Sequence, residues 1–147
     1  MNITLSHLSK ASFYSVILSF ALSTSVFSAE QDRQSVKLSV SLAPALQDKL
    51  NPEYTLFVYA RAAKGPRMPL AIVSHKAGEL PLETQLDASM AMMPQMSLTK
   101  FQHVIFMARI SASGNAMTQP GDLMGETTPL EWQTLDNPVV IIINKQN

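Results

Sequence analysis

Hydrophobic and polar residues alternate strictly in SVKLSVSL, residues 35–42. A period of two is typical of a strand with one buried face, so this segment predicts a half-buried strand. LPLETQLD, residues 80–87, repeats the pattern less regularly. The expected inward faces are Val36, Leu38, Val40 and Leu42 in the first segment and Leu80, Leu82, Thr84 and Leu86 in the second.

Further apolar runs are bounded by proline and glycine. YTLFVYARA and LAIVSH flank a turn at Lys64-Gly65-Pro66 and predict a hairpin with a longer loop. HVIFMARISAS and the final VVIIIN are β-branched and aromatic runs of the kind that fills central strands. Between strands, PALQDKL predicts only a short helical turn, because Pro44 suits a first helical turn and Asn51-Pro52 follows.

Six or seven short strands without a long helix indicate an all-β fold. We expect an immunoglobulin-like antiparallel β-sandwich of about seven strands, with a small barrel as the alternative. The Cys-Trp-Cys signature of antibody domains is missing, because the chain has no cysteine and Trp132 is its single tryptophan. Two layers of hydrophobic strands can form the core without it.

The amino-terminal region predicts export. Residues 11–27 are apolar or hydroxylic and carry no charge, as in a secretory signal. Val26 and Ser28 suit cleavage before Ala29, which gives a signal peptide at 1–28 and one domain at 29–147 of about 119 residues. The alternative is a retained anchor helix, but spanning needs roughly 20 mainly apolar residues and this run is shorter and rich in serine. We expect a periplasmic protein with no membrane span after processing.

Composition excludes several function classes. The absence of cysteine rules out a thiol nucleophile, a CxxC redox centre and thiolate metal sites. The expected mature chain carries ten basic and eleven acidic residues without a basic patch, so nucleic acid is not an expected partner. GxSxG does not occur, and three histidines provide no nucleophile–base set. We therefore expect no enzymatic activity and no cofactor.

Four of the nine methionines fall within seven residues: Met90, Met92, Met93 and Met96. Pro94 excludes one uninterrupted helix through them, so we expect a loop or a strand edge. Thioethers pack into irregular space or form an adaptable protein-binding surface. They are also soft ligands for Cu(I), with His75 or His103 as possible additional ligands. Packing or protein contact is our first interpretation, and copper binding is the alternative.

A second candidate is the loop in SASGNAMTQPGDLMGE. Gly114-Asn115 and Pro120-Gly121-Asp122 have the composition of tight turns. Loops on a rigid sandwich often carry recognition, so Asn115, Gln119 and Asp122 are candidate partner-binding residues beside the methionines. Turn chemistry that merely joins two strands is the alternative. Arg61 and Arg109, each inside an apolar run, are expected to lie at the sheet surface or to pair with a carboxylate.

Several longer strings carry a resemblance to a known family. FVYARAAKGPRMPLA, LPLETQLDASMAMMPQMSL and SGNAMTQPGDLMG resemble the periplasmic C-terminal domain of the c-type cytochrome biogenesis protein CycH, also called CcmI. The resemblance runs in order from about Ser35 to Asn144. It implies an immunoglobulin-like fold and a place near haem ligation, where full-length members hold apocytochrome c and assist the ligase complex.

The chain also departs from that family. Full-length members carry membrane spans and a tetratricopeptide array ahead of this domain, and we find no 34-residue period here. We therefore expect this chain to share the fold, the periplasmic setting and an accessory role in cytochrome c maturation. We do not expect it to share the apocytochrome binding that the tetratricopeptide array provides. The expected partners are maturation components or a tetratricopeptide protein encoded separately.

Overall fold

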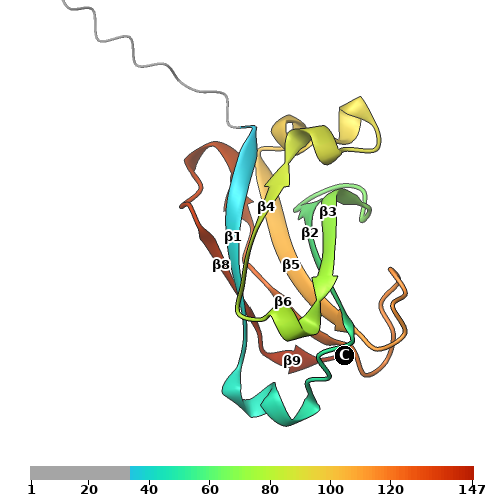
Figure 1. The fold of residues 1–147 in the computed structure, drawn as a ribbon. Helices are drawn as coiled ribbons and strands as arrows, with labels where there is room; N and C mark the ends of the chain where they lie inside the picture. Colours follow the sequence, from blue (N-terminus) through green and yellow to red (C-terminus); the bar gives the residue numbers. More distant parts are fainter. Residues whose placement is uncertain (1–33) are drawn as a thin grey trace, which may run out of the picture. The chain divides into compact units, whose positions relative to one another are not determined.

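A computed structural model describes residues 34–147 and shows two β-sheets packed face to face (Figure 1). The smaller sheet has the order β4-β1-β8, and the larger has the order β3-β2-β5-β6-β9, with β7 also paired to β5. The predicted all-β, immunoglobulin-like sandwich is confirmed. The strands are β1 Ser35–Leu42, β2 Thr55–Ala62, β3 Pro69–Lys76, β4 Leu82–Asp87, β5 His103–Ser111, β6 Leu123–Glu126, β7 Leu130–Glu131, β8 Val139–Ile143 and β9 Lys145–Gln146.

Helical structure within this part of the chain is limited to short 3-10 turns. They are η1 Pro44–Lys49, η2 Ala77–Glu79, η3 Ala88–Met90, η4 Pro94–Met96, η5 Leu98–Lys100 and η6 Trp132–Thr134. The predicted turn after the first strand is η1, with Pro44 as its first residue. The predicted hairpin is β2–β3, in which Thr55 pairs with Lys76 and Tyr59 with Ile72.

The alternation in β1 holds in three dimensions. Val36, Leu38, Val40 and Leu42 are all buried, whereas Lys37 is exposed. These side chains meet the inward faces of β2 and β5 in one core, which also contains Trp132. The apolar area removed from water along such strands is the main favourable term in folding.

Two expectations about strand placement are wrong. β8 does not occupy a central position: it is an end strand of the smaller sheet, and Val140 and Ile142 are exposed. It also runs parallel to β1, with Leu38 paired to Val139 and Leu42 to Ile143, so the sandwich is not purely antiparallel. A run of five β-branched residues hides which side chains face water, and it does not reveal strand direction.

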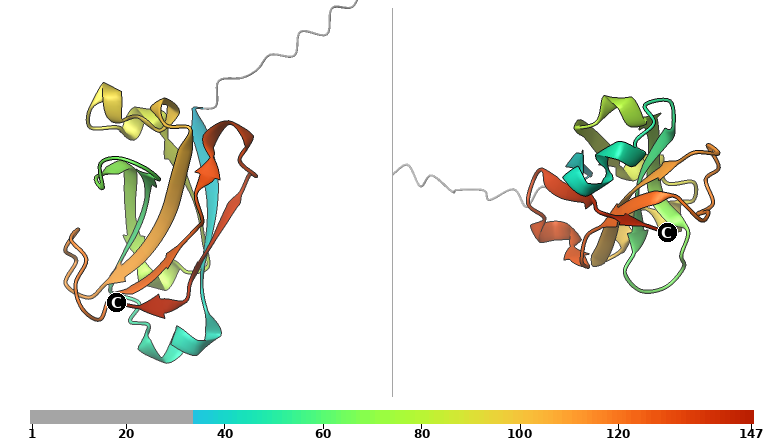
Figure 2. Two further views of the ribbon diagram at one scale, coloured as in Figure 1. Left: turned by 180° about the vertical axis from the view of Figure 1, so that it is seen from behind. Right: turned by 90° about the horizontal axis from the view of Figure 1, so that it is seen from below.

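The two sheets meet at the carboxyl end of β8. An ideal Cβ placed on Gly125 of β6 would lie 2.1 Å from the carbonyl oxygen of Ile142, so only glycine permits this approach. The Asn144 amide then donates to the Met124 carbonyl at 3.2 Å, and β9 joins β6 in the larger sheet. Figure 2 shows β8 crossing to the larger sheet beside the carboxyl terminus.

Candidate partner-binding surfaces

The methionines lie in the connection between β4 and β5, residues 88–102, which carries the chain from the smaller sheet to the larger one. Asp87 begins this connection by accepting a hydrogen bond from the Ser89 amide at 2.7 Å. Pro94 then opens η4, as a residue without an amide hydrogen can at a first helical position. The Ser97 hydroxyl donates back to the Ala88 carbonyl at 3.2 Å. The connection is therefore three tied 3-10 turns, and no long helix passes through the methionines.

The four methionines divide by exposure. Met96 is only 8% exposed and packs in the core with Leu98, which anchors the connection. Met92 is 87% exposed, and Met90 and Met93 are 38% and 36% exposed. One thioether therefore packs, as the first interpretation allowed, and three are presented to solvent.

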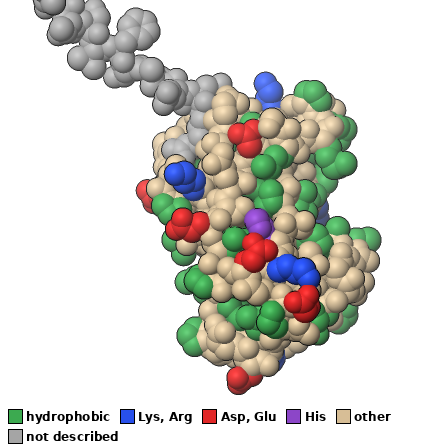
Figure 3. All heavy atoms as spheres, viewed as in Figure 1, with side chains coloured by type: hydrophobic (Ala, Val, Ile, Leu, Met, Phe, Trp, Pro, Cys, Tyr) green, Lys and Arg blue, Asp and Glu red, His purple; other side chains and the backbone are tan. Residues whose placement is uncertain are grey.

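The exposed thioethers extend a larger apolar surface. The turn η3 lies against β3, where Ile72 and the preceding Met68 are also exposed. Hydrophobic side chains gather at the upper right of Figure 3, the part of the view in which Figure 1 places the turns after β4. We call this set the methionine patch and define it as Met68, Ile72, Met90, Met92 and Met93.

The β5–β6 loop, residues 112–122, is organised around a buried cation. Nη1 of Arg109 donates to Oδ2 of Asp122 at 2.6 Å, and Nη2 donates to the carbonyl oxygens of Asn115 and Ala116 at 3.1 and 2.6 Å. The Arg109 guanidinium also lies over the ring of Phe57, 5.1 Å from its centroid, within cation–π range. A planar donor group thus ties the loop to the sheet.

The three candidate residues of this loop have different positions. Asp122 is buried and accepts from both Arg109 and the Gln119 amide, the latter at 2.9 Å. Asn115 and Gln119 are exposed, and the Asn115 side chain accepts from the Met117 amide at 2.9 Å. The structure therefore gives Asp122 and Asn115 a role in shaping the loop, and it leaves part of the Asn115 and Gln119 surface open to a partner.

Arg61 and Arg109 were expected to lie at the sheet surface or to pair with a carboxylate, and both pair with a carboxylate. Arg61 lies 3.7 Å from Glu126 at the surface, and Arg109 pairs with Asp122 inside the protein. His75 is engaged on both ring nitrogens: Nδ1 lies 3.2 Å from Glu79 and Nε2 lies 3.1 Å from Thr84 on the other sheet. Within residues 34–147 no group of three or more histidine and carboxylate side chains is arranged to hold a metal ion.

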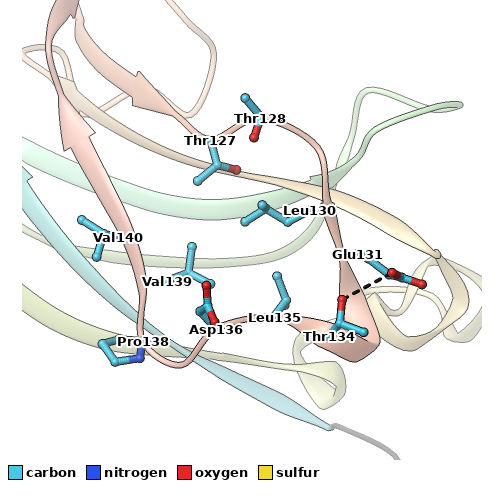
Figure 4. A pocket seen from close by; sticks show the side chains of 10 residues that line it. All are labelled: Thr127, Thr128, Leu130, Glu131, Thr134, Leu135, Asp136, Pro138, Val139 and Val140. Atoms are coloured by element: carbon cyan, nitrogen blue, oxygen red, sulfur yellow. Dashed lines mark hydrogen bonds between the residues drawn. The ribbon is translucent and has the colours of Figure 1, made fainter.

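A cleft of about 470 Å³ opens between the start of β8 and the segment from β6 to β7 (Figure 4). Leu130, Leu135 and Val139 supply apolar surface, while Glu131 and Asp136 contribute exposed carboxylates. Neither the cleft nor the contribution of Met68 and Ile72 to the methionine patch was predicted. The position of a residue next to a strand does not indicate which other element it will face. Spacing along the sequence therefore could not show that these residues lie together.

The paired sheets and the sheet-changing β8–β9 segment define an immunoglobulin-like β-sandwich domain, which carries an exposed apolar patch. Residues 36–144 match the family model described as the cytochrome c-type biogenesis protein H Ig-like domain. The chain belongs to this family, so the resemblance noted in the sequence is confirmed.

A curated relative is the cytochrome c-type biogenesis protein CycH of Pseudomonas aeruginosa, which is 38% identical over 93 residues. The aligned region is 63% of this chain and 22% of that relative, so this chain corresponds to a minor part of its length. Among solved structures, an alternative pilotin from the type II secretion system of Vibrio cholerae has a TM-score of 0.44 and 20% identity, covering 74% of this chain and 95% of the pilotin.

Two expectations concern membranes and export. Across residues 34–147, no helix combines the length and apolar character that crossing a bilayer requires. The predicted signal peptide at 1–28 lies outside the described residues, so both the cleavage site and the 29–147 boundary stay predictions.

Proposed function

We propose that this domain is a periplasmic, non-enzymatic interaction module that acts as an accessory in c-type cytochrome biogenesis. It contacts maturation components, or a separately encoded tetratricopeptide protein, and thereby supports haem ligation or apocytochrome handling. Membership of the CycH Ig-like family supports the pathway, and the exposed methionine patch supports the mode of action.

The single observation that carries the contact site is the exposure of three neighbouring thioethers on an anchored connection. Large apolar side chains grouped on a surface mark interaction sites more often than isolated ones do. Methionine suits such a site because its unbranched, polarisable side chain adapts to different partner shapes. Met96 and Leu98 anchor the connection in the core, so the exposed methionines project from a segment whose position is fixed.

Cross-linking in bacterial cells that export the chain to the periplasm tests this proposal. The full chain is compared with a triple variant, Met90→Ser, Met92→Ser and Met93→Ser, after in vivo cross-linking and affinity recovery. We expect the wild-type chain to recover a cytochrome c maturation component or a tetratricopeptide protein, and the triple variant to recover several-fold less.

Gln47→Ser is the control, because Gln47 is exposed on η1 and belongs to neither candidate surface. It should recover as much partner as the wild type. Equal recovery by the triple variant would reject the methionine patch as the contact site, and recovery of no maturation component or tetratricopeptide protein would reject the accessory role.

Copper binding at the same methionines is a second candidate, supported by the exposure of three thioethers on one short connection. Titration of the purified domain with Cu(I) against a competing chelator tests it. Copper binding predicts affinity that disappears when Met90, Met92 and Met93 become leucine. The buried Met96 provides the comparison, since Met96→Leu should preserve a site made by the exposed thioethers.

A further inference from the structure

The second edge of β8 is open where the two sheets separate. The Ala43 amide donates to the Ile143 carbonyl at 2.9 Å, so the polar backbone groups of Ile143 face β1. Backbone groups of successive strand residues point to opposite sides, and those of Val140 and Ile142 therefore face away from β1. Within residues 34–147, β8 pairs with no strand on that side.

The two ends of this edge differ. The Ile142 carbonyl is directed at Gly125, where β6 closes against it. Farther toward the start of β8, the cleft described above separates Val139 and Val140 from Thr127, Thr128 and Leu130. The opposite wall of the cleft is hydrogen-bonded to β5 on the side that faces away from the cleft. There the Thr127 amide donates to the Phe106 carbonyl at 3.0 Å, and Leu130 pairs with Val104. The cleft thus lies between two extended segments that each have a free side.

β8 also lacks the features that protect the other end strands. Natural sheets discourage unwanted pairing with charged residues or proline on their edges. Among the end strands of the two described sheets, β3 contains Pro69 and Lys76, β4 contains Glu83 and Asp87, and β9 contains Lys145. β8 consists of two valines and three isoleucines, with Val140 and Ile142 exposed by 60% and 51%. This edge is open to an added strand.

The charges at the cleft select among extended segments. Glu131 and Asp136 line it, and neither forms an ion pair within residues 34–147. The Glu131 carboxylate accepts a hydroxyl hydrogen bond from Thr134, at 3.3 Å. A segment with a lysine or arginine near these carboxylates is electrostatically complementary, whereas an acidic segment is repelled.

We propose that the edge of β8 binds an extended polypeptide segment by β-augmentation, with aliphatic or β-branched side chains at alternate positions and a basic residue at Glu131 and Asp136. The backbone of the segment pairs with the Val140 amide and carbonyl and with the Ile142 amide, because β6 closes against the Ile142 carbonyl. An apolar side chain enters the cleft against Leu130 and Val139. Main-chain pairing provides affinity in this mode and alternate side chains provide specificity. The proposal concerns a second surface and does not depend on the methionine patch.

The test uses the purified domain and two capped synthetic heptapeptides. One alternates valine with threonine and carries a lysine at each end; the other is identical but has glutamate at both ends. Binding is followed by amide hydrogen exchange and by the fluorescence of Trp132, the single tryptophan, which lies between the cleft residues Glu131 and Thr134. We expect the lysine peptide to slow exchange at Val140 and Ile142 and to bind at least about fivefold more tightly than the glutamate peptide.

Variants separate the backbone from the charges. Val140→Pro removes the amide donor at the open edge and should weaken lysine-peptide binding at least about tenfold. Val140→Lys places a charge on the same edge and tests that edge without removing the amide. Ser74→Lys, at an exposed position of the end strand β3 outside the methionine patch, is the control. Glu131→Gln combined with Asp136→Asn should remove the preference for the lysine peptide and leave the fold intact.

Three results would overturn the proposal. The first is unchanged exchange at Val140 and Ile142 with millimolar lysine peptide. The second is equal binding of both peptides that neither the Val140 variants nor the carboxylate variants alter. The third is protection of the β8 amides that rises with protein concentration alone, because a second copy of the domain would then be the occupant.

Discussion

Arg109 and Asp122 form an ion pair inside the protein, with Nη1 and Oδ2 separated by 2.6 Å and side chains only 1% and 4% exposed. The same guanidinium donates to three carbonyl groups of the β5–β6 loop, those of Asn115, Ala116 and Met117. One buried cation therefore connects a central strand of the larger sheet to the loop that carries Asn115 and Gln119.

Asp122→Asn is expected to destabilise the domain strongly. It leaves the buried Arg109 charge without its counter-ion, which typically costs about 3–5 kcal/mol. Urea unfolding followed by Trp132 fluorescence measures the loss. Glu53→Gln is the control, because it removes the exposed ion pair with Lys76 and should leave the unfolding midpoint unchanged. Equal midpoints for the two variants would contradict a structural role for the buried pair.

Gly125→Ala is expected to separate β6 from the end of β8. The added methyl would overlap the Ile142 carbonyl, and relieving such overlap costs about 3 kcal/mol or more when backbone must move. Gly65→Ala tests conformation alone, since Gly65 has a φ of 107° and open space around its Cβ position; it should cost about 1–2 kcal/mol. Hydrogen exchange at the Asn144 amide should accelerate only in Gly125→Ala, and an unchanged rate there would contradict the close approach.

The conformation of η3, the turn that carries Met90, should change with pH only in the acidic range. Hydrogen bonds from Ser89, from its side chain first and then its amide, lower the pKa of Asp87 below its usual value of 3.8. A carboxylate with a lowered folded-state pKa stabilises the fold above its unfolded pKa and loses that contribution as pH falls through the folded value. NMR titration should therefore show the Ser89 amide unshifted from neutral pH to about 4, with a change below 3.8. A transition near neutral pH would contradict this assignment.

Oxidation should follow the exposure of the methionines. Brief treatment of the folded domain with hydrogen peroxide should convert Met92 and Met117 to the sulfoxide first, because oxidation depends on access to sulfur. Met96 and Met107, each 8% exposed, should react at least about tenfold more slowly. Peptide mass spectrometry measures the order, and the difference should vanish in urea. Rapid oxidation of Met96 in the folded domain would contradict its position in the core.

Local sequence patterns were sufficient for most of the fold. The alternation from Val36 to Leu42 predicted the buried face of β1, and the Lys64-Gly65-Pro66 turn predicted the β2–β3 hairpin. Both depend on neighbours along the chain, where side-chain direction and turn conformation are directly encoded. The short strands β6, β7 and β9 were not predicted, and the residues of β6 were assigned to a loop, because strands of two to four residues leave no periodic signal.

The candidate sites were only partly accessible to the same reasoning. The methionine cluster was evident from composition, and Pro94 indicated that no single helix runs through it. Sequence left open which thioethers face water, and it did not indicate that η3 lies against β3, the strand that carries Ile72. It also gave no sign that Glu131 and Asp136 flank the open edge of β8, since those relationships cross between separate elements.

The chain by itself determined the kind of fold and its family, because alternating side chains and specific strings are local properties of the sequence. The tertiary structure alone decided that β8 is an end strand parallel to β1, that Arg109 reaches Asp122 in the interior, and that Met96 is buried while Met92 is exposed. Each of these depends on which surface another segment covers. That choice is made by packing between residues distant in sequence, so no local pattern contains it.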